Sequence, residues 1–187
     1  MPNFIKEIVS GGQTGVDRAA LDVAMALQIN HGGWCPFGRK AEDGIIPYKY
    51  HLEEAQAPTF AEKNDADAIY KKRTELNARD SDGTLIIVKD PPMGGTQYTI
   101  EMAAKYHKPY FFFYLFTKQS EQIDELINWI LTNDIHKLNV AGPRASQTQD
   151  IYNEASKVLK QIFSHPILQQ DQAYQQTFIT PIKPNIR

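Results

Sequence analysis

Three glycine-containing turns in this sequence carry the residue types that bind phosphate groups. They are residues 10–17 (Ser-Gly-Gly-Gln-Thr-Gly-Val-Asp), residues 94–96 (Gly-Gly-Thr) and residues 142–144 (Gly-Pro-Arg). Glycine adopts positive φ and leaves backbone N–H groups uncovered, while the first N–H groups of a helix have no partner within the helix. Such turns favour an anion, most often a phosphate, although each pattern alone also occurs as a plain turn.

Side chains near these turns predict the remaining contacts of a phosphate site. Threonine hydroxyls donate hydrogen bonds, and Arg73 and Arg144 can each hold phosphate oxygens through two N–H groups. Alternative interpretations are an ion pair within a helix for Arg73, a surface charge for Arg144, and a helix capping box, Thr-x-x-Asp, for Thr14 with Asp17. The predicted ligand-binding residues are Gly11, Gly12, Thr14, Gly15, Arg73, Gly94, Gly95, Thr96, Thr99, Gly142 and Arg144.

Two carboxylates are candidates for catalysis if the protein is an enzyme. Glu101 and Asp17 would orient a ribose or activate a water molecule at the same crevice. The alternative for Glu101 is a solvated position on the face of a helix. Cys35 has no second cysteine beside it, and no Cys/His spacing resembles a zinc site, so we predict no metal site.

Strands and helices alternate along the chain and must position these groups. We expect an α/β fold of Rossmann-like type, with an open, mainly parallel sheet and helices on both faces. Loops that leave parallel strands collect at one edge of the sheet, so the three turns are expected to face a common crevice. The expected strands are residues 4–9, 84–88, 110–116 and 138–140, and the expected helices are residues 16–27, 66–76, 95–107, 120–131 and 151–163.

Two stretches do not follow this alternation. Residues 32–44 are dense in glycine and charge and predict a long ordered loop, in which Arg39 and Lys40 are either solvated or closed over a ligand. His165-Pro166 is expected to end the last helix, because proline disfavours helix at the preceding residue. We therefore predict one ligand-binding domain over residues 1–165 and a tail over residues 166–187, which is extended or packs on a neighbouring subunit of a homo-oligomer.

Composition limits the classes of partner. The chain has 187 residues, a formal net charge of −2 and one cysteine. A general nucleic-acid binder would show a basic face, and no apolar run reaches membrane-spanning length, so we expect neither nucleic acid nor membrane as a partner. Lys6 and Glu7 interrupt the apolar residues at the N-terminus, which argues against a signal peptide. We expect a cytoplasmic protein with a phosphate-bearing small molecule as its partner.

Taken together, these motifs resemble a known family. The chain is similar, from about residue 8 to residue 157, to the family named for putative molybdenum carrier proteins. That family is related to molybdenum-cofactor carriers and forms a circularly permuted branch of the Rossmann-like SLOG superfamily, which includes lysine-decarboxylase-like phosphoribohydrolases. The matching blocks are residues 10–17, 33–44, 73–77, 81–86, 94–99 and 138–146.

The resemblance implies a carrier or binding protein whose ligand is the molybdenum cofactor (molybdopterin) or a nucleotide. The alternative that it implies is an enzyme that hydrolyses the N-glycosidic bond of a nucleoside monophosphate. Against the phosphoribohydrolase signature Pro-Gly-Gly-x-Gly-Thr-x-x-Glu, residues 93–101 keep the two glycines and Glu101 but have Gln97 and Tyr98 in place of Gly and Thr. Phe37 also stands where a basic residue is expected. A third interpretation is a module that acts through an oligomer face or its tail.

Overall fold

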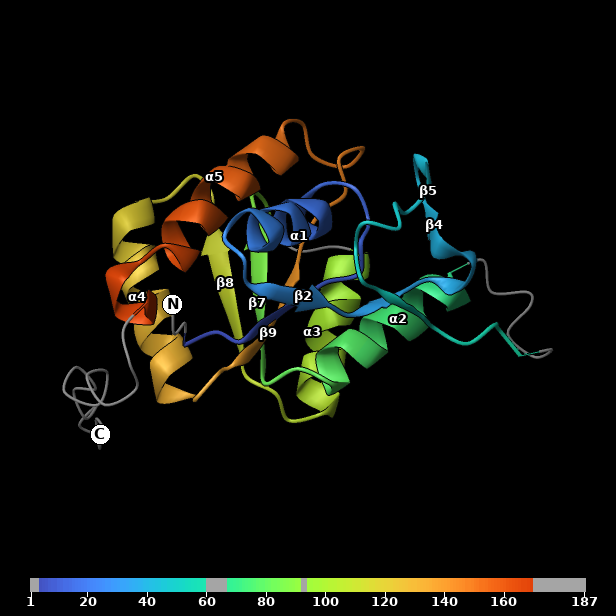
Figure 1. The fold of residues 1–187 in the computed structure, drawn as a ribbon, viewed down its shortest axis with the longest axis horizontal. Coiled ribbons are helices and arrows are strands. Elements are labelled where there is room, and N and C mark those ends of the chain that lie inside the picture. The colour runs from blue at the N-terminus through green and yellow to red at the C-terminus, as the bar shows by residue number, and fades with distance from the viewer. Residues whose placement is uncertain (1–3, 60–66, 92–93, 170–187) are drawn as a thin grey trace.

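The computed structural model describes residues 4–59, 67–91 and 94–169 (Figure 1). Its centre is a sheet of five parallel strands in the order β2-β1-β9-β7-β8. The strands are β1 (Glu7–Val9), β2 (Asn30–Gly32), β7 (Gly83–Val88), β8 (Tyr110–Tyr114) and β9 (Lys137–Ala141). From β1 the chain moves outward to the edge strand β2. The strands β7 and β8 form the other half of the sheet, with β8 at its edge. Strand β9 comes last in the sequence and lies between β1 and β7.

Helices cover both faces of this sheet, as Figure 1 shows. On one face, α1 (Val16–Ala26) packs against α5 (Ile151–Phe163), and α4 (Gln119–Thr132) lies beside them. On the other face, α2 (Ala68–Arg79) packs against α3 (Gly95–Lys105). The predicted Rossmann-like α/β fold is therefore confirmed.

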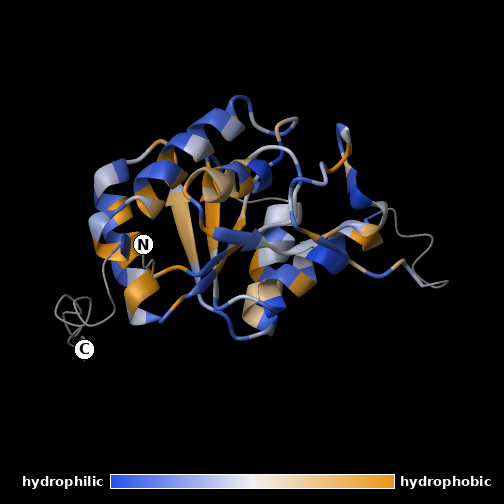
Figure 2. Cartoon of the chain, viewed as in Figure 1, coloured by the Kyte–Doolittle hydropathy of each residue, from blue (hydrophilic) through white to orange (hydrophobic). Residues whose placement is uncertain are grey.

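The main core lies between the sheet and the layer of α1, α4 and α5. Apolar side chains of the strands and of these helices face one another there, while the outer helix faces are hydrophilic (Figure 2). Every residue of β7 is buried. A continuous apolar run is typical of a parallel strand that is covered on both sides, as the sequence predicted for residues 84–88.

Residues 33–54 form an ordered arm beyond the edge strand β2. Within the arm, β3 (Trp34–Cys35) pairs with β6 (Glu53–Glu54), and β4 (Lys40–Ala41) forms a hairpin with β5 (Gly44–Ile45) after the short helix η1 (Phe37–Arg39). A small core of its own joins the arm to α1, and burial there raises the pKa of the Cys35 thiol. The residues of this small core are Leu21, Cys35, Ile46, Tyr50 and Leu52.

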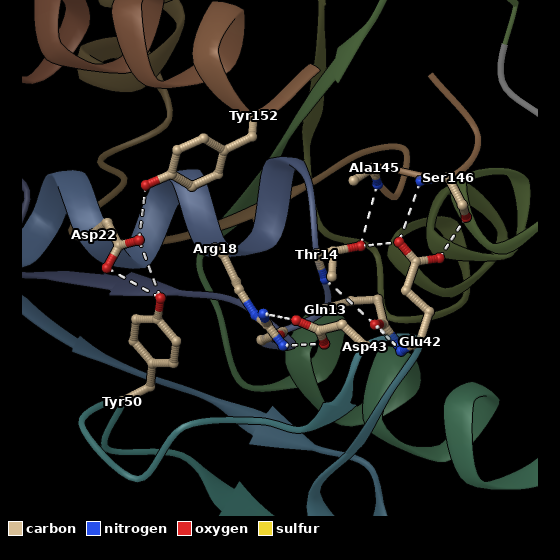
Figure 3. A network of polar contacts seen from close by, with 11 residues as sticks. Gln13, Thr14, Arg18, Asp22, Glu42, Asp43, Tyr50, Ala145, Ser146 and Tyr152 are labelled. Carbon is tan, nitrogen blue, oxygen red and sulfur yellow. Dashed lines mark hydrogen bonds and ion pairs between the residues drawn. The ribbon is translucent and has the colours of Figure 1, made fainter. Parts of the chain in front are cut away.

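Polar contacts also fasten the arm to the helices (Figure 3). The Asp22 carboxylate on α1 accepts hydrogen bonds from Lys49 Nζ (2.7 Å), Tyr50 OH (3.0 Å) and Tyr152 OH (2.9 Å). Arg18 on α1 forms an ion pair with Asp43 of the hairpin. The arm thus has a defined position on the domain.

The structure contradicts both interpretations of Arg39, which were a solvated charge and a side chain that closes over a ligand. The side chain is buried, with 5% exposed, and donates hydrogen bonds to backbone carbonyls of the arm rather than facing solvent or a ligand. Its acceptors are the carbonyl oxygens of Ile46 (3.1 Å), Leu52 (3.0 Å), Pro47 (3.1 Å) and Tyr50 (3.1 Å). A guanidinium suits this role because its several N–H groups satisfy many acceptors of an irregular backbone at once.

Several local predictions differ from the structure. Helix α4 begins at Gln119, one residue before the predicted start at residue 120, so Ser120 lies inside the helix rather than at its cap. Helix α2 continues to Arg79, three residues beyond the predicted end at residue 76, and Ala66 lies outside the described residues. Strand β2 was not predicted, because Asn30 and His31 give it no apolar alternation.

The C-terminal part of the described chain closes the main core. Helix α5 ends at Phe163, before His165-Pro166 as predicted, and the short helix η2 (Pro166–Gln169) follows. Leu168 is fully buried in the main core, and its carbonyl accepts a hydrogen bond of 2.7 Å from the N–H of Phe4. The rest of the predicted tail, residues 170–187, lies outside the described residues.

Candidate functional site

A pocket of about 490 Å³ opens at the carboxyl ends of β1, β7 and β9. The turn after β1 contributes Gln13 and Asp17, α2 contributes Tyr70 and Arg73, and the turn after β9 contributes Arg144. The first turn of α3 forms the remaining wall. In open parallel sheets ligands bind at this edge, where the direction of chain progression reverses. Four segments that are far apart in the sequence therefore meet at one concave surface.

Most of the residues that the sequence singled out line this pocket. Gly11, Gly12, Thr14 and Gly15 are not among the residues that line it. The predicted residues that line the pocket are Asp17, Arg73, Gly94, Gly95, Thr96, Thr99, Glu101, Gly142 and Arg144.

The glycines of the first turn have packing roles in the structure. Any side chain at Gly11 would collide with the guanidinium of Arg73, and one at Gly12 would collide with Leu52 of the arm. Gly15 is the N-cap of α1 with φ of 79°, and a Cβ there would collide with the Pro143 carbonyl. The turn is therefore glycine-rich because Arg73, the arm and the β9 turn all approach its backbone closely.

Asp17 and Arg73 form a largely buried pair on the wall of the pocket. Arg73 Nη1 lies 3.1 Å from Asp17 Oδ2, with 17% and 4% of the two side chains exposed. Burial raises the pKa of the Asp17 carboxyl, while the Arg73 guanidinium and a hydrogen bond from the Gln13 N–H oppose that rise. Arg73 Nε is buried and has no hydrogen-bond partner.

Gln13 is a pocket residue that sequence reasoning missed. Its Oε1 accepts hydrogen bonds from the backbone N–H groups of Thr14 (3.3 Å) and Glu42 (3.0 Å). Because two N–H donors identify Oε1 as the acceptor, the amide orientation is set, and Nε2 is left buried without a partner. The only signal in the sequence was the position of Gln13 inside the first glycine turn.

Thr14 does not form the capping box that was one interpretation of this turn. No side chain caps α1, and Asp17 instead accepts a hydrogen bond of 3.2 Å from the N–H of Gln13. The Thr14 hydroxyl donates to Glu42 of the arm and accepts a hydrogen bond of 3.2 Å from the N–H of Ala145 (Figure 3). Thr14 thus links the arm to the turn after β9.

The start of α3 presents backbone donors to the pocket. Gly94 precedes the helix with φ of 56°, and no atom of the described residues lies within 4 Å of where a Cβ of Gly94 or Gly95 would be. Thr96 is buried on the pocket wall, while the Thr99 hydroxyl already donates to the Gly95 carbonyl at 3.0 Å. The unpaired N–H groups of a first helical turn carry partial positive charge and attract anions.

Arg144 also lines the pocket. Its guanidinium carbon lies 5.8 Å from the centre of the Tyr70 ring, and this contact joins the turn after β9 to α2. The backbone N–H of Arg144 donates to Gln147 Oε1 at 3.2 Å. The pocket therefore contains two arginines, one held by Asp17 and one beside an aromatic ring.

Comparison with known proteins places this arrangement in a family. Residues 8–163 match the model of the circularly permuted YpsA SLOG family. The chain belongs to this family. A crystal structure titled "Putative molybdenum carrier protein", from Syntrophus aciditrophicus SB, is 40% identical, with 87% of this chain and 96% of that chain covered and a TM-score of 0.77. No curated protein matches the sequence.

Glu101 is the second catalytic candidate predicted from the sequence of this SLOG-family protein. It is exposed on α3 and lines the same pocket as Gly94 and Gly95, the two glycines shared with the phosphoribohydrolase signature. Among residues 4–59, 67–91 and 94–169, no group of three His, Cys, Asp or Glu side chains could hold a metal ion. No helix in those same ranges is long and apolar enough to cross a membrane.

Proposed function

We propose that this SLOG-family protein binds a phosphate-bearing small molecule in the pocket and serves as its carrier. The observation that carries the proposal is a pair of unsatisfied donors. Gln13 Nε2 and Arg73 Nε are buried and have no hydrogen-bond partner among the described residues, and both residues line the pocket. Burying a donor without a partner is unfavourable, so a ligand oxygen that accepts from each would recover that free energy.

The donors around the pocket suit an anion. Arg73 and Arg144 line it together with Lys71 and the positive end of the α3 dipole at Gly95 and Thr96. Three carboxylates, Asp17, Asp67 and Glu101, line it as well, so the formal charges cancel and the case for a phosphate depends on where the donors lie. Asp17 fixes the Arg73 guanidinium, which therefore does not have to be ordered when a ligand binds.

The ligand is proposed to be a nucleotide or the molybdenum cofactor, because both carry such a phosphate. The donor set fits the phosphate of the cofactor, which Arg73, Arg144 and the first turn of α3 would hold. The related protein from Syntrophus aciditrophicus SB is named a putative molybdenum carrier protein, and this supports the cofactor as the ligand of the chain described here. Because no cluster of metal ligands is present in the described ranges, the protein would hold the cofactor through its organic part.

A binding experiment tests the proposal. Native mass spectrometry of gently purified protein should show a retained small-molecule mass, with or without molybdenum, and calorimetry should detect binding of AMP. Arg144→Ala should weaken AMP binding by about tenfold and make its salt dependence shallower, because one charged contact is lost. Arg79→Ala is the matched control, since Arg79 is exposed and pairs with Asp80 away from the pocket. Unchanged affinity in Arg144→Ala would remove Arg144 from the site.

A second candidate function is supported by the position of Glu101. A carboxylate on the wall of a phosphate pocket is the group that N-glycosidic hydrolysis of a nucleoside monophosphate needs for orienting ribose or activating water. Release of free base from a panel of nucleoside monophosphates, abolished in Glu101→Gln, would establish this enzyme. Retained AMP binding without base release would favour the carrier.

A further inference from the structure

We infer that Glu42, on the arm outside the pocket, is a positioning residue for Arg144. Its carboxylate holds the turn after β9 in the conformation that presents Arg144 to the ligand. The inference rests on the proposed function, because it assigns the arm a part in that same site. It follows from where the Glu42 carboxylate lies and from what that carboxylate touches.

The carboxylate of Glu42 is surrounded by donors from two turns (Figure 3). The hydroxyls of Thr14 and Ser146 both donate to it, and the N–H of Ser146 lies 3.2 Å from Oε1. Partial desolvation acts to raise the pKa of Glu42, but these hydrogen bonds outweigh it, so the pKa lies below its usual range. The group is therefore an ionised acceptor at neutral pH, and hydrogen bonds to ionised acceptors are the stronger ones.

Those donors belong to the segment that carries Arg144. Ser146 lies two residues after Arg144, and the N–H of Ala145 between them donates to Thr14, which in turn donates to Glu42. This turn lies between β9 and α5, and its residues 144–150 are not part of any regular element. A short irregular segment of this kind depends on side-chain contacts for its order. Glu42 supplies three of those contacts, directly or through Thr14.

Glu42 itself is held from the other side. Its backbone N–H donates to Gln13 Oε1 at 3.0 Å, and its neighbour Asp43 accepts from Arg18 Nη2 at 2.7 Å. The hairpin of β4 and β5 thus sits between α1 and the turn after β9. The Glu42 side chain accepts hydrogen bonds from that turn, whereas the Asp43 side chain pairs with Arg18 on α1. Substitutions of these two neighbours therefore distinguish support of the turn from attachment of the arm to α1.

Preorganisation explains how this contact affects a ligand. If the turn is ordered before binding, Arg144 forms its contact without a further entropic cost. Without the Glu42 carboxylate, the turn would have to be ordered by the ligand itself. We therefore expect Glu42→Ala to weaken AMP binding by about tenfold, an effect close to that of losing Arg144.

The first experiment needs no ligand. Hydrogen exchange of the full-length protein should show the amides of residues 144–147 exchanging about tenfold faster in Glu42→Ala than in the wild type. Asp43→Ala should leave those amides unchanged, because it removes only the pair with Arg18. Glu42→Gln keeps one acceptor oxygen for the N–H of Ser146 and should restore part of the protection. Unchanged exchange in Glu42→Ala would overturn the inference.

The second experiment is a double-mutant cycle with AMP as the probe. If Glu42 acts through Arg144, then Glu42→Ala should change affinity less than about twofold in an Arg144→Ala background. Equal losses in both backgrounds, or an equal loss in Asp43→Ala, would contradict a role in positioning Arg144. Absence of AMP binding by the wild type would instead count against a nucleotide as the ligand, while the exchange experiment would still decide whether Glu42 holds the turn.

Discussion

At the scale of residues, the position of the Arg73 guanidinium in the pocket depends on the absence of a side chain at Gly11. The guanidinium lies over the backbone of Gly11 and pairs with Asp17, so it occupies space that a side chain at position 11 would fill. Gly11 itself does not line the pocket. Its importance for a ligand is therefore proposed to be indirect, through the place it leaves for Arg73.

Gly11→Ala tests this indirect role. The methyl group should displace the guanidinium and weaken AMP binding by about tenfold, because the charged donor moves out of position. Stability should fall by only about 1 kcal/mol, since the end of an arginine side chain adjusts its conformation more easily than backbone does. Calorimetry with AMP and urea unfolding measure the two effects. In an Arg73→Gln background the added methyl should have no further effect on affinity, and an equal loss there would refute the mechanism.

Arg39 has a structural role that leads to a different expectation. Replacing it with alanine leaves four buried or partly buried carbonyls of the arm without their donor. We expect Arg39→Ala to lower the free energy of unfolding by about 3 kcal/mol, because unsatisfied buried acceptors and a lost charged donor both contribute. Urea unfolding measures it, with the exposed neighbour in Lys40→Ala as the control. A loss equal to that of the control would show that the arm does not depend on this side chain.

The same residues show what sequence can and cannot predict at this scale. Arg144 was predicted to bind a ligand from its type and its place in the turn after a strand, and Arg73 from its type within a block that matches the family; both line the pocket. Gln13 was missed and Arg39 was interpreted wrongly because their environment is created by the arm, whose course over α1 depends on contacts distant in sequence. Thr14 was interpreted as a local cap for the same reason, since its partner Glu42 is 28 residues away.

At the scale of elements, β2 meets the arm through two histidines. The rings of His31 on β2 and His51 stack with their centroids 5.0 Å apart, and His31 Nε2 is buried without a partner. Burial, and then the charge of His51, lower the pKa of His31, while Lys49 and Asp22 oppose this. The neutral ring is therefore the form that the folded arm accommodates.

This arrangement predicts destabilisation in mild acid. Because the folded pKa of His31 lies below the unfolded value near 6.5, the unfolded chain takes up its proton first as pH falls. The stability that the neutral ring contributes is complete above about pH 6.5 and is lost below it. Urea midpoints at pH 7.5 and 5.5 should differ less in His31→Asn than in the wild type. His107→Asn, at an exposed position, is the control, and the same reduction there would exclude a special role for His31.

In the edge strand β8, a side chain from a helix satisfies backbone groups that no neighbouring strand pairs with. Gln122 on α4 accepts from the Tyr114 N–H (2.8 Å) and donates to the Tyr114 carbonyl (2.9 Å), as a neighbouring strand would. An edge strand with unpaired backbone groups invites association with other chains. The side-chain amide therefore satisfies one exposed position of a strongly apolar strand, Tyr-Phe-Phe-Phe-Tyr.

At the scale of the whole molecule, alternation of strands and helices was enough to predict the sheet and its two helical layers. Apolar residues at the helical period predicted α1 and α5, and a continuous apolar run predicted β7. Strand β2 and the arm were not predictable in the same way. Their residues are polar or glycine-rich, and their order comes from the main domain against which they pack.

The packed unit is expected to end at residue 169 rather than at 165. A chain truncated after Gln169 should keep the unfolding free energy of the full protein, because the described core is then complete. Truncation after His165 removes buried Leu168 and should cost about 3 kcal/mol, as the loss of a core leucine does. Urea unfolding of the two truncated proteins compares them. Equal stability would show that η2 contributes nothing to the fold.

The single cysteine of this chain, Cys35, is fully buried in the small core of the arm, and its thiol pKa is raised. Thiolate is the reactive form, so maleimide reagents should leave the folded protein unmodified. A cysteine engineered at an exposed position, such as Lys40 on the hairpin, would then be the sole attachment point for a fluorophore. The natural protein is therefore suited to single-site labelling, and a fluorophore on the arm can report its surroundings without first removing a native thiol.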